Sequence, residues 1–281
     1  MDIICQAEEF HECRLKVTEK ALYREINKDP GIRFPIKADV TLAWHKIKLL
    51  LQSELGAIEF PTSDYLQKKK FTFQQEKNLV FGHVNRLIRC VIDCLIAKND
   101  SIAVRNALEL GRSFGAKVWD HSPLQMKQIE QIGIVAVRKL AAAGIKDIEE
   151  LEATEASRID MILSKNPPFG FKLLSRLKEF PKLRVTMRVL SKVRELGTTA
   201  AYHCANQKVL QNMKKGVMQV RFEIDVAFMN DKIALYYQQK PVFVCCLTGT
   251  SDGRLVDFRR VRSVCLRQPF ANIALTADFQ C

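Results

Sequence analysis

The pattern of hydrophobic and polar positions changes twice along the chain. From residue 1 to about 120, apolar residues recur at helical spacing, and two long helices are predicted at about 72–98 and 101–119. From about 121 to 182, the predicted helices are short and are joined by tight turns. Beyond about 183, hydrophobic and polar residues alternate, as in Val217–Val226, which is typical of β-strands. We therefore expect helices first and strands last.

The last third of the chain contains several short segments with strand character. Further strands are predicted at about 232–237, 241–248, 254–261 and 271–279, with Gly249–Gly253 as a hairpin turn. Short strands at this spacing indicate a β-sandwich. The predicted fold class is multidomain, α then β: a helical bundle over residues 1–120, a helix-hairpin-helix module over 121–182, and the sandwich over 183–281.

The middle module is predicted from a stretch that resembles a helix-hairpin-helix. A helix ends near Ile129, Gly133 lies in the tight turn, and a second helix runs from about 134 to 143 before Gly144. In this motif, backbone amides at a helix N-terminus face a nucleic-acid phosphate. We therefore name Gly133 as a candidate DNA-binding residue.

The hairpin departs from the usual motif at one position. Two glycines commonly flank the apolar residue of the turn, but the first position here is Gln131. Because glutamine has less backbone freedom than glycine, a hairpin that only packs the module together remains an alternative. Arg138 and Lys139 on the following helix are candidate DNA-binding residues, unless they are simply solvated.

A second turn, Asn166–Gly170, leads into another short helix with basic residues. Two prolines restrict its backbone and Gly170 permits a sharp reversal, so we expect the helix N-terminus to face outward. Lys172 and Arg176 on this helix are candidate DNA-binding residues. A rigid connector with Phe169 buried is an equal alternative.

The predicted helix 101–119 carries two different faces, and Ser101 is its expected N-cap. At about 100° per residue, Arg105, Arg112 and Trp119 fall on one ridge, because they are seven residues apart. Guanidinium groups bind phosphates and an indole stacks on an unpaired base, so this ridge is a candidate single-strand site. Core packing is the alternative for Trp119. The apolar stripe expected to face the bundle core consists of Ala103, Ala107, Leu110, Phe114 and Val118.

The charge of the chain favours a polyanionic partner. The formal net charge is +13, and residues 183–281 hold fifteen Lys or Arg against seven Asp or Glu. Lysine and arginine side chains that neutralise phosphates release condensed counterions, which favours binding to nucleic acid. Nine cysteines without a CxxC pair indicate a reducing compartment and no zinc site. No apolar run approaches the roughly 20 residues that span a bilayer, so no membrane partner is expected.

The order of modules and several long runs resemble the C-terminal accessory region of Ski-two-like superfamily-two helicases, called the Sec sixty-three homology region. Within that class, the chain is most similar to the meiotic crossover DNA helicases, closely over residues 1 to about 195 and more loosely beyond. The runs that carry the resemblance are IICQAEEFHECRLKVTEKALYREINKDPGIRFPIK, VNRLIRCVIDCLIAKND, ALELGRSFGAKVWDHSPLQMKQIE and ILSKNPPFGFKLL.

The resemblance implies a fold, an activity and partners. It implies an immunoglobulin-like sandwich, expected to be incomplete because the chain stops at Cys281. The implied activity is ATP-dependent 3′-to-5′ unwinding of single-stranded or branched DNA during recombination in meiotic nuclei. Mismatch-repair-type proteins are implied partners. The helix at 101–119 is similar to the so-called ratchet helix, with Arg112 and Trp119 at its basic and aromatic positions.

The motor of such helicases lies in two RecA-like domains that use ATP and Mg²⁺. This sequence has no GxxxxGK loop followed by Ser or Thr, since the stretch from Gly111 to Lys117 lacks that spacing, and it has no acidic Mg²⁺-binding box. We expect no cofactor and no ATP hydrolysis in this chain alone, and we expect the motor in a preceding part of a fuller chain.

Three functions remain open from the sequence. The first is a strand-guiding region of a DNA helicase. The second is a scaffold whose basic sandwich recruits an acidic protein partner. The third is the same accessory region of a spliceosomal RNA helicase.

Overall fold

The computed structural model describes residues 1–195, 217–230, 236–237, 239–263 and 271–280. The chain divides into two compact units, Met1–Leu174 and Ser175–Cys281. The first holds helices, and the second contains small antiparallel sheets, so the predicted order of helices before strands is confirmed. The division into three modules remains a prediction. Among the described residues, no helix combines the length and the hydrophobicity needed to cross a membrane.

The first half of the helical unit is built around α3. This helix is buried almost throughout, and its Leu49, Leu50 and Leu51 side chains have no exposed surface. It contacts α1, α2 and α5, so it forms the centre of the bundle. The elements of this half are α1 (Asp2–Cys5), η1 (Glu8–Phe10), η2 (Val17–Glu19), α2 (Lys20–Asn27), α3 (Ala43–Leu55), α4 (Asp64–Gln67), α5 (Lys70–Ala97) and α6 (Ser101–Ala116).

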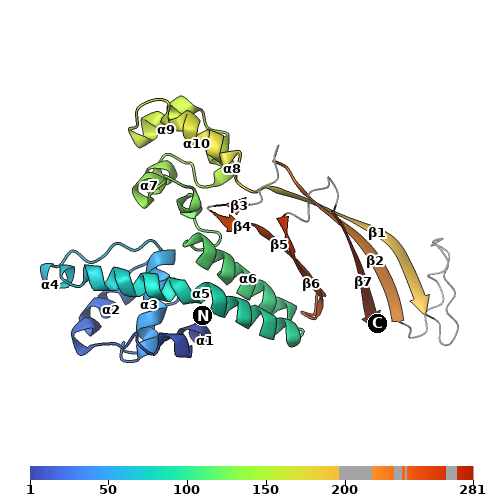
Figure 1. The fold of residues 1–281 in the computed structure, drawn as a ribbon, viewed down its shortest axis with the longest axis horizontal. Helices are drawn as coiled ribbons and strands as arrows, with labels where there is room; N and C mark the ends of the chain where they lie inside the picture. Colours follow the sequence, from blue (N-terminus) through green and yellow to red (C-terminus); the bar gives the residue numbers. More distant parts are fainter. Residues whose placement is uncertain (196–216, 231–235, 238, 264–270, 281) are drawn as a thin grey trace. The chain divides into compact units, whose positions relative to one another are not determined.

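The two long helices α5 and α6 lie side by side (Figure 1). They correspond to the helices predicted at 72–98 and 101–119, but two details of the second prediction were wrong. The N-cap is Asp100, whose side chain accepts a hydrogen bond of 2.8 Å from the Ala103 amide. The helix ends at Ala116, because Lys117 adopts a left-handed backbone conformation with φ of 54°. Of the predicted apolar stripe, Ala107, Phe114 and Val118 are buried.

The second half of the helical unit consists of short elements. The segment before the hairpin is a 3₁₀ turn, and the helix after it agrees with the predicted range of 134–143. Gly144 follows that helix with φ of 91°, as expected for a glycine at a helix end. The elements are η3 (Gln125–Gln128), α7 (Ile134–Ala142), α8 (Ile148–Glu152), α9 (Ala156–Leu163) and α10 (Phe169–Leu177), with the boundary between the two compact units inside α10.

The second unit is organised in small antiparallel sheets. The order in the largest is β1-β2-β7, while β3 pairs with β4 and β5 pairs with β6 (Figure 1). A cluster around Ile224 and Val226 of β2 packs against Val244, Cys246 and Val261 of the β5–β6 hairpin, so this hairpin packs against the larger sheet. The strands are β1 (Leu183–Glu195), β2 (Val217–Phe228), β3 (Tyr236–Tyr237), β4 (Lys240–Pro241), β5 (Phe243–Gly249), β6 (Leu255–Arg262) and β7 (Ala271–Gln280).

These strands agree with most of the predicted ones. The turn between β5 and β6 occupies the predicted hairpin position, and Gly253 takes φ of 91° there. Of the strand predicted at 232–237, residues 232–235 lie outside the described part of the chain. The immunoglobulin-like form of the sandwich remains a prediction.

Candidate nucleic-acid interface

Two of the three predicted ridge residues are exposed on α6, and the third lies beyond the end of this helix. Arg105 and Arg112 are exposed on α6, where two turns of helix separate them. The Arg112 guanidinium lies 2.5 Å from the Asp120 carboxylate. Because the Arg112 side chain is exposed, water weakens this ion pair. Arg105 makes no ion pair with the described residues. Both guanidinium groups are therefore accessible at the surface, Arg112 while paired with Asp120.

Trp119 does not continue this ridge. Because α6 ends at Ala116, the side chain of Trp119 turns inward and is only 6% exposed. Its ring packs edge-on against Phe34, with the centroids 5.7 Å apart, and its amide donates to the Leu55 carbonyl at 3.1 Å. The placement of Trp119 on an exposed helical ridge was wrong, since a buried indole presents no face to an unpaired base.

Arg33 is a basic residue of this region that sequence reasoning missed. Its guanidinium lies 4.7 Å from the centroid of the Trp119 ring and donates to the Asp120 carbonyl at 3.3 Å. The side chain remains exposed. No local pattern marks Arg33, because the residues it contacts lie far along the chain. It adds a cation near the C-terminal end of α6, where Arg112 also binds Asp120.

The hairpin presents its turn to solvent. Gly133 is exposed, it precedes the first turn of α7, and a Cβ added to it would meet no atom within 4 Å. Gln131, which stands where the motif usually has glycine, adopts φ of 69°, a left-handed conformation that favours glycine. Gln131 therefore adopts the backbone conformation that a glycine would favour at this position.

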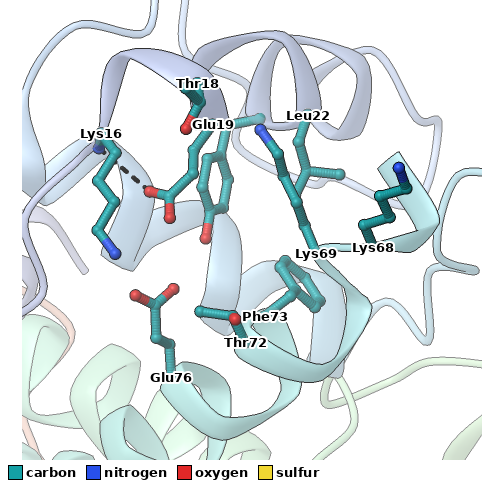
Figure 2. A pocket seen from close by; sticks show the side chains of 10 residues that line it. Lys16, Thr18, Glu19, Leu22, Lys68, Lys69, Thr72, Phe73 and Glu76 are labelled. Carbon is teal, nitrogen blue, oxygen red and sulfur yellow. Dashed lines mark hydrogen bonds between the residues drawn. The ribbon is translucent and has the colours of Figure 1, made fainter. Parts of the chain in front are cut away.

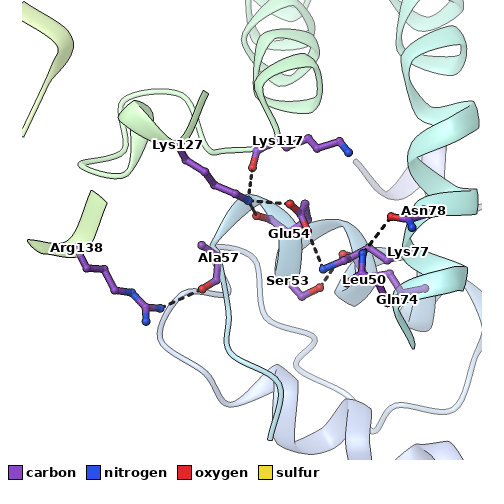
Figure 3. A network of polar contacts seen from close by, with 10 residues as sticks. All are labelled: Leu50, Ser53, Glu54, Ala57, Gln74, Lys77, Asn78, Lys117, Lys127 and Arg138. Atoms are coloured by element: carbon purple, nitrogen blue, oxygen red, sulfur yellow. Dashed lines mark hydrogen bonds and ion pairs between the residues drawn. The ribbon is translucent and has the colours of Figure 1, made fainter. Parts of the chain in front are cut away.

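The two basic residues of α7 have different surroundings. Lys139 is exposed and makes no ion pair with the described residues. Arg138 instead forms an ion pair with Glu59 and donates to the Ala57 carbonyl at 3.2 Å, the latter contact visible in Figure 3. Arg138 thus joins α7 to the loop after α3, which makes Lys139 the more available cation.

A polar network around Glu54 also fixes the hairpin on the bundle (Figure 3). One carboxylate oxygen lies 2.8 Å from the ammonium group of Lys127, and the other lies 2.6 Å from that of Lys77. Lys127 also donates to the Lys117 carbonyl at 2.9 Å. Burial alone would raise the pKa of Glu54, but hydrogen bonds from Lys127 and Lys77 and their charges outweigh it and lower the pKa. The network links α3, α5 and the segment before the hairpin.

The N-terminus of α10 does not face outward as expected. The Gly170 amide donates to the buried carboxylate of Asp160 at 2.6 Å. A Cβ at Gly170 would lie 2.2 Å from the Ala156 carbonyl oxygen, so the helix start is pressed against α9. This prediction was wrong, because Asp160 already occupies the helix N-terminus. Lys172 is exposed, whereas Arg176 is half-buried and its Nη1 has no hydrogen-bond partner among the described residues.

Comparison with protein families matches residues 1–276 to the Sec63 Brl domain. The chain belongs to this family. It is 29% identical over 275 residues to the ATP-dependent DNA helicase MER3 of Saccharomyces cerevisiae, covering 96% of this chain and 21% of that protein. It is 30% identical over 194 residues to the probable ATP-dependent DNA helicase HFM1 of Homo sapiens, covering 68% of this chain and 13% of that protein.

This Sec63 Brl domain chain thus spans about a fifth or less of the length of these relatives. The family match runs through the helices and the sheets, so both compact units belong to the same family region. Within the described residues, no group of three or more His, Cys, Asp or Glu side chains is placed to hold a metal ion. The functional candidates of this Sec63 Brl domain are its exposed cations.

Proposed function

We propose that this chain is the strand-guiding accessory region of an ATP-dependent DNA helicase. The observation that carries the proposal is the pair of exposed arginines, Arg105 and Arg112, on one face of α6. They are separated by about 10 Å along the helix axis, so one extended strand can contact both. Arg33, beside the end of the helix, supplies a further cation.

The hairpin provides the second contact in this proposal. Backbone amides at the start of α7 meet a phosphate beside Gly133, and Lys139 adds its charge. Lys172 and Arg176 of α10 complete the set of basic candidates. Such contacts position a strand without reading its sequence.

The chemistry of unwinding belongs to other domains in this proposal. RecA-like domains would bind ATP and Mg²⁺ and move 3′ to 5′ along single-stranded or branched DNA, in meiotic recombination and crossover formation in the nucleus. The relatives named as ATP-dependent DNA helicases support this reading. This chain would keep the strand in place between steps and so raise processivity.

A second candidate function is recruitment of a protein partner by the sheet unit. The arginines of β6, Arg259, Arg260 and Arg262, are exposed. An acidic segment of a mismatch-repair-type protein would complement the charge of these arginines. In this proposal they lie on the surface of an immunoglobulin-like sandwich.

The strand-guiding proposal is tested by arginine substitutions in the whole chain. We expect the variant Arg105→Ala/Arg112→Ala to bind labelled single-stranded DNA about tenfold more weakly, because two charged contacts with phosphates are lost. Fluorescence anisotropy measures the affinity. The matched control is Arg86→Ala, which removes an exposed arginine of α5 that pairs with Glu9 at 3.0 Å.

The same titration separates the alternatives. Equal affinities of the double variant and the original chain would remove α6 as the strand contact. Equal competition by RNA and DNA of one sequence would favour the RNA helicase reading.

A further inference from the structure

We infer that the junction of α4 and α5 forms another contact surface for single-stranded nucleic acid, built from Tyr65, Lys68 and Phe71. This inference rests on the proposed function, because it takes nucleic acid as the ligand. It concerns a part of the bundle that includes none of the basic candidates on α6, α7 and α10. We call these three residues the aromatic–lysine row.

The two aromatic rings of the row are unusually open to solvent. Tyr65 is 61% exposed and Phe71 is 72% exposed. Neither ring packs against another aromatic ring of the described residues. A phenyl ring that is 72% exposed contributes little to the core, and its open face is available to a partner that stacks on it.

The three residues follow one another at intervals of three positions across the junction of α4 and α5. The Leu66 amide donates to the Ser63 carbonyl and the Lys69 amide donates to the Leu66 carbonyl, both at 2.8 Å. These hydrogen bonds join residues three positions apart, as in a 3₁₀ turn, where side chains three positions apart lie on the same side. Tyr65 lies in α4 and Phe71 in the first turn of α5, so Lys68, in the turn between the two helices, is placed between them along the chain.

The surroundings of the row are positively charged. Residues 61–75 contain three lysines, Lys68, Lys69 and Lys70, against the single acidic residue Asp64. None of the three lysines makes an ion pair with the described residues. Unpaired ammonium groups next to exposed rings match a ligand that combines phosphates with bases.

An adjoining pocket indicates from which side a phosphate would approach Lys68. Lys16, Lys68 and Lys69 line this pocket together with Glu19 and Glu76, and Figure 2 shows Lys68 on the side of the pocket away from Lys16. Both carboxylates bind the ammonium group of the fully buried Lys46, at 2.9 Å and 2.7 Å. The two carboxylates disfavour an anion beside them, so Lys68, on the side of the pocket away from Lys16, is the better phosphate contact.

The same features favour a single strand over a duplex. In a duplex the faces of the bases are covered by their neighbours, so exposed rings gain nothing from it. In a single strand, each base offers a face, and stacking on an aromatic side chain tolerates any sequence. The row would hold two bases with one phosphate between them.

The test uses the whole chain and oligodeoxythymidine as the probe. We expect Tyr65→Ala/Phe71→Ala to weaken binding by about tenfold or more, because each stacked base contributes substantially. The slope of log K against log salt should stay unchanged, because no charge is removed. Lys68→Gln should instead reduce that slope by about 0.7, the value for one phosphate of a single strand.

The matched control is Ile3→Ala, which removes an apolar side chain on α1 that is 78% exposed. Thermal unfolding checks that every variant folds. Unchanged affinity of the aromatic variant, with binding by the original chain intact, overturns the row and leaves the proposed function standing. An equal loss of affinity for duplex DNA overturns stacking, and a change in self-association alone shows a contact between copies. Absence of binding by the original chain overturns both proposals.

Discussion

The indole of Trp119 contacts both the Phe34 ring and the Arg33 guanidinium, and α6 has already ended before it. The apolar pattern continues to Val118, so the sequence predicts a helix to that point and beyond. Lys117 nevertheless takes a left-handed conformation and ends α6. Non-glycine residues rarely adopt this conformation. The residue that ends the helix is nevertheless Lys117 and not Gly115, two positions earlier. Exposure of Arg105 and Arg112 followed from periodicity, whereas the burial of Trp119 depended on contacts distant in sequence.

Substitution of Trp119 distinguishes a packing role from DNA contact. We expect Trp119→Ala to lower the free energy of unfolding by about 3–5 kcal/mol, because a large buried ring leaves a cavity. Trp119→Phe should cost less and should leave affinity for single-stranded DNA within about twofold of the original, since the ring stays in the core. Urea unfolding and anisotropy measure the two quantities. A Phe variant of full stability with a large loss of affinity would restore the stacking role.

Among the helices and strands, features that depend on residues within one segment were predictable, whereas contacts between distant segments were not. The hairpin turn between β5 and β6 and the start of α7 follow from glycines and alternation in their own segments. The direction of α10 was not predictable, because its N-terminus binds Asp160, which belongs to α9. The Glu54 network likewise joins three segments that no local pattern connects.

Two glycines, one in the hairpin turn and one at the start of α10, provide a matched test of this part of the chain. We expect Gly170→Ala to destabilise the chain by about 1–3 kcal/mol, because its Cβ would collide with the Ala156 carbonyl. Gly133→Ala should fold normally, since nothing lies near its Cβ, yet bind DNA more weakly if a phosphate approaches the hairpin closely. Thermal unfolding and anisotropy distinguish the effects. Full DNA affinity of the Gly133 variant would make the hairpin a packing element only.

The Glu54 network predicts a pH dependence of stability. The folded chain lowers the pKa of Glu54, so its contribution is present above the unfolded pKa of about 4.3 and is lost as pH falls through the lower folded value. We expect Glu54→Gln to be less stable than the original at pH 7, and the difference to shrink in acid. Urea unfolding between pH 7 and pH 3 measures this. A difference that stays constant with pH would show that the carboxylate charge is not what stabilises the network.

For the whole molecule, the hydrophobic pattern predicted that helices precede strands, but it did not predict how the helices pack. The change of period near residue 183 separates helices from sheets, as the structure confirms. The central position of α3 was not evident, because its buried Lys46 breaks the apolar pattern and is balanced by Glu19 and Glu76 from other helices. Eight of the thirteen net positive charges fall in residues 183–281 and the other five in residues 1–182, and this basic balance motivates the claim that the chain binds a DNA strand.

That claim is tested most directly by the affinity of the whole chain for single-stranded DNA as salt is raised from 50 to 200 mM. The account predicts that log K falls linearly with log salt, with a slope of roughly −1.4 or steeper, since at least two phosphates are neutralised. Binding that does not change with salt, or no binding at 50 mM, would contradict it.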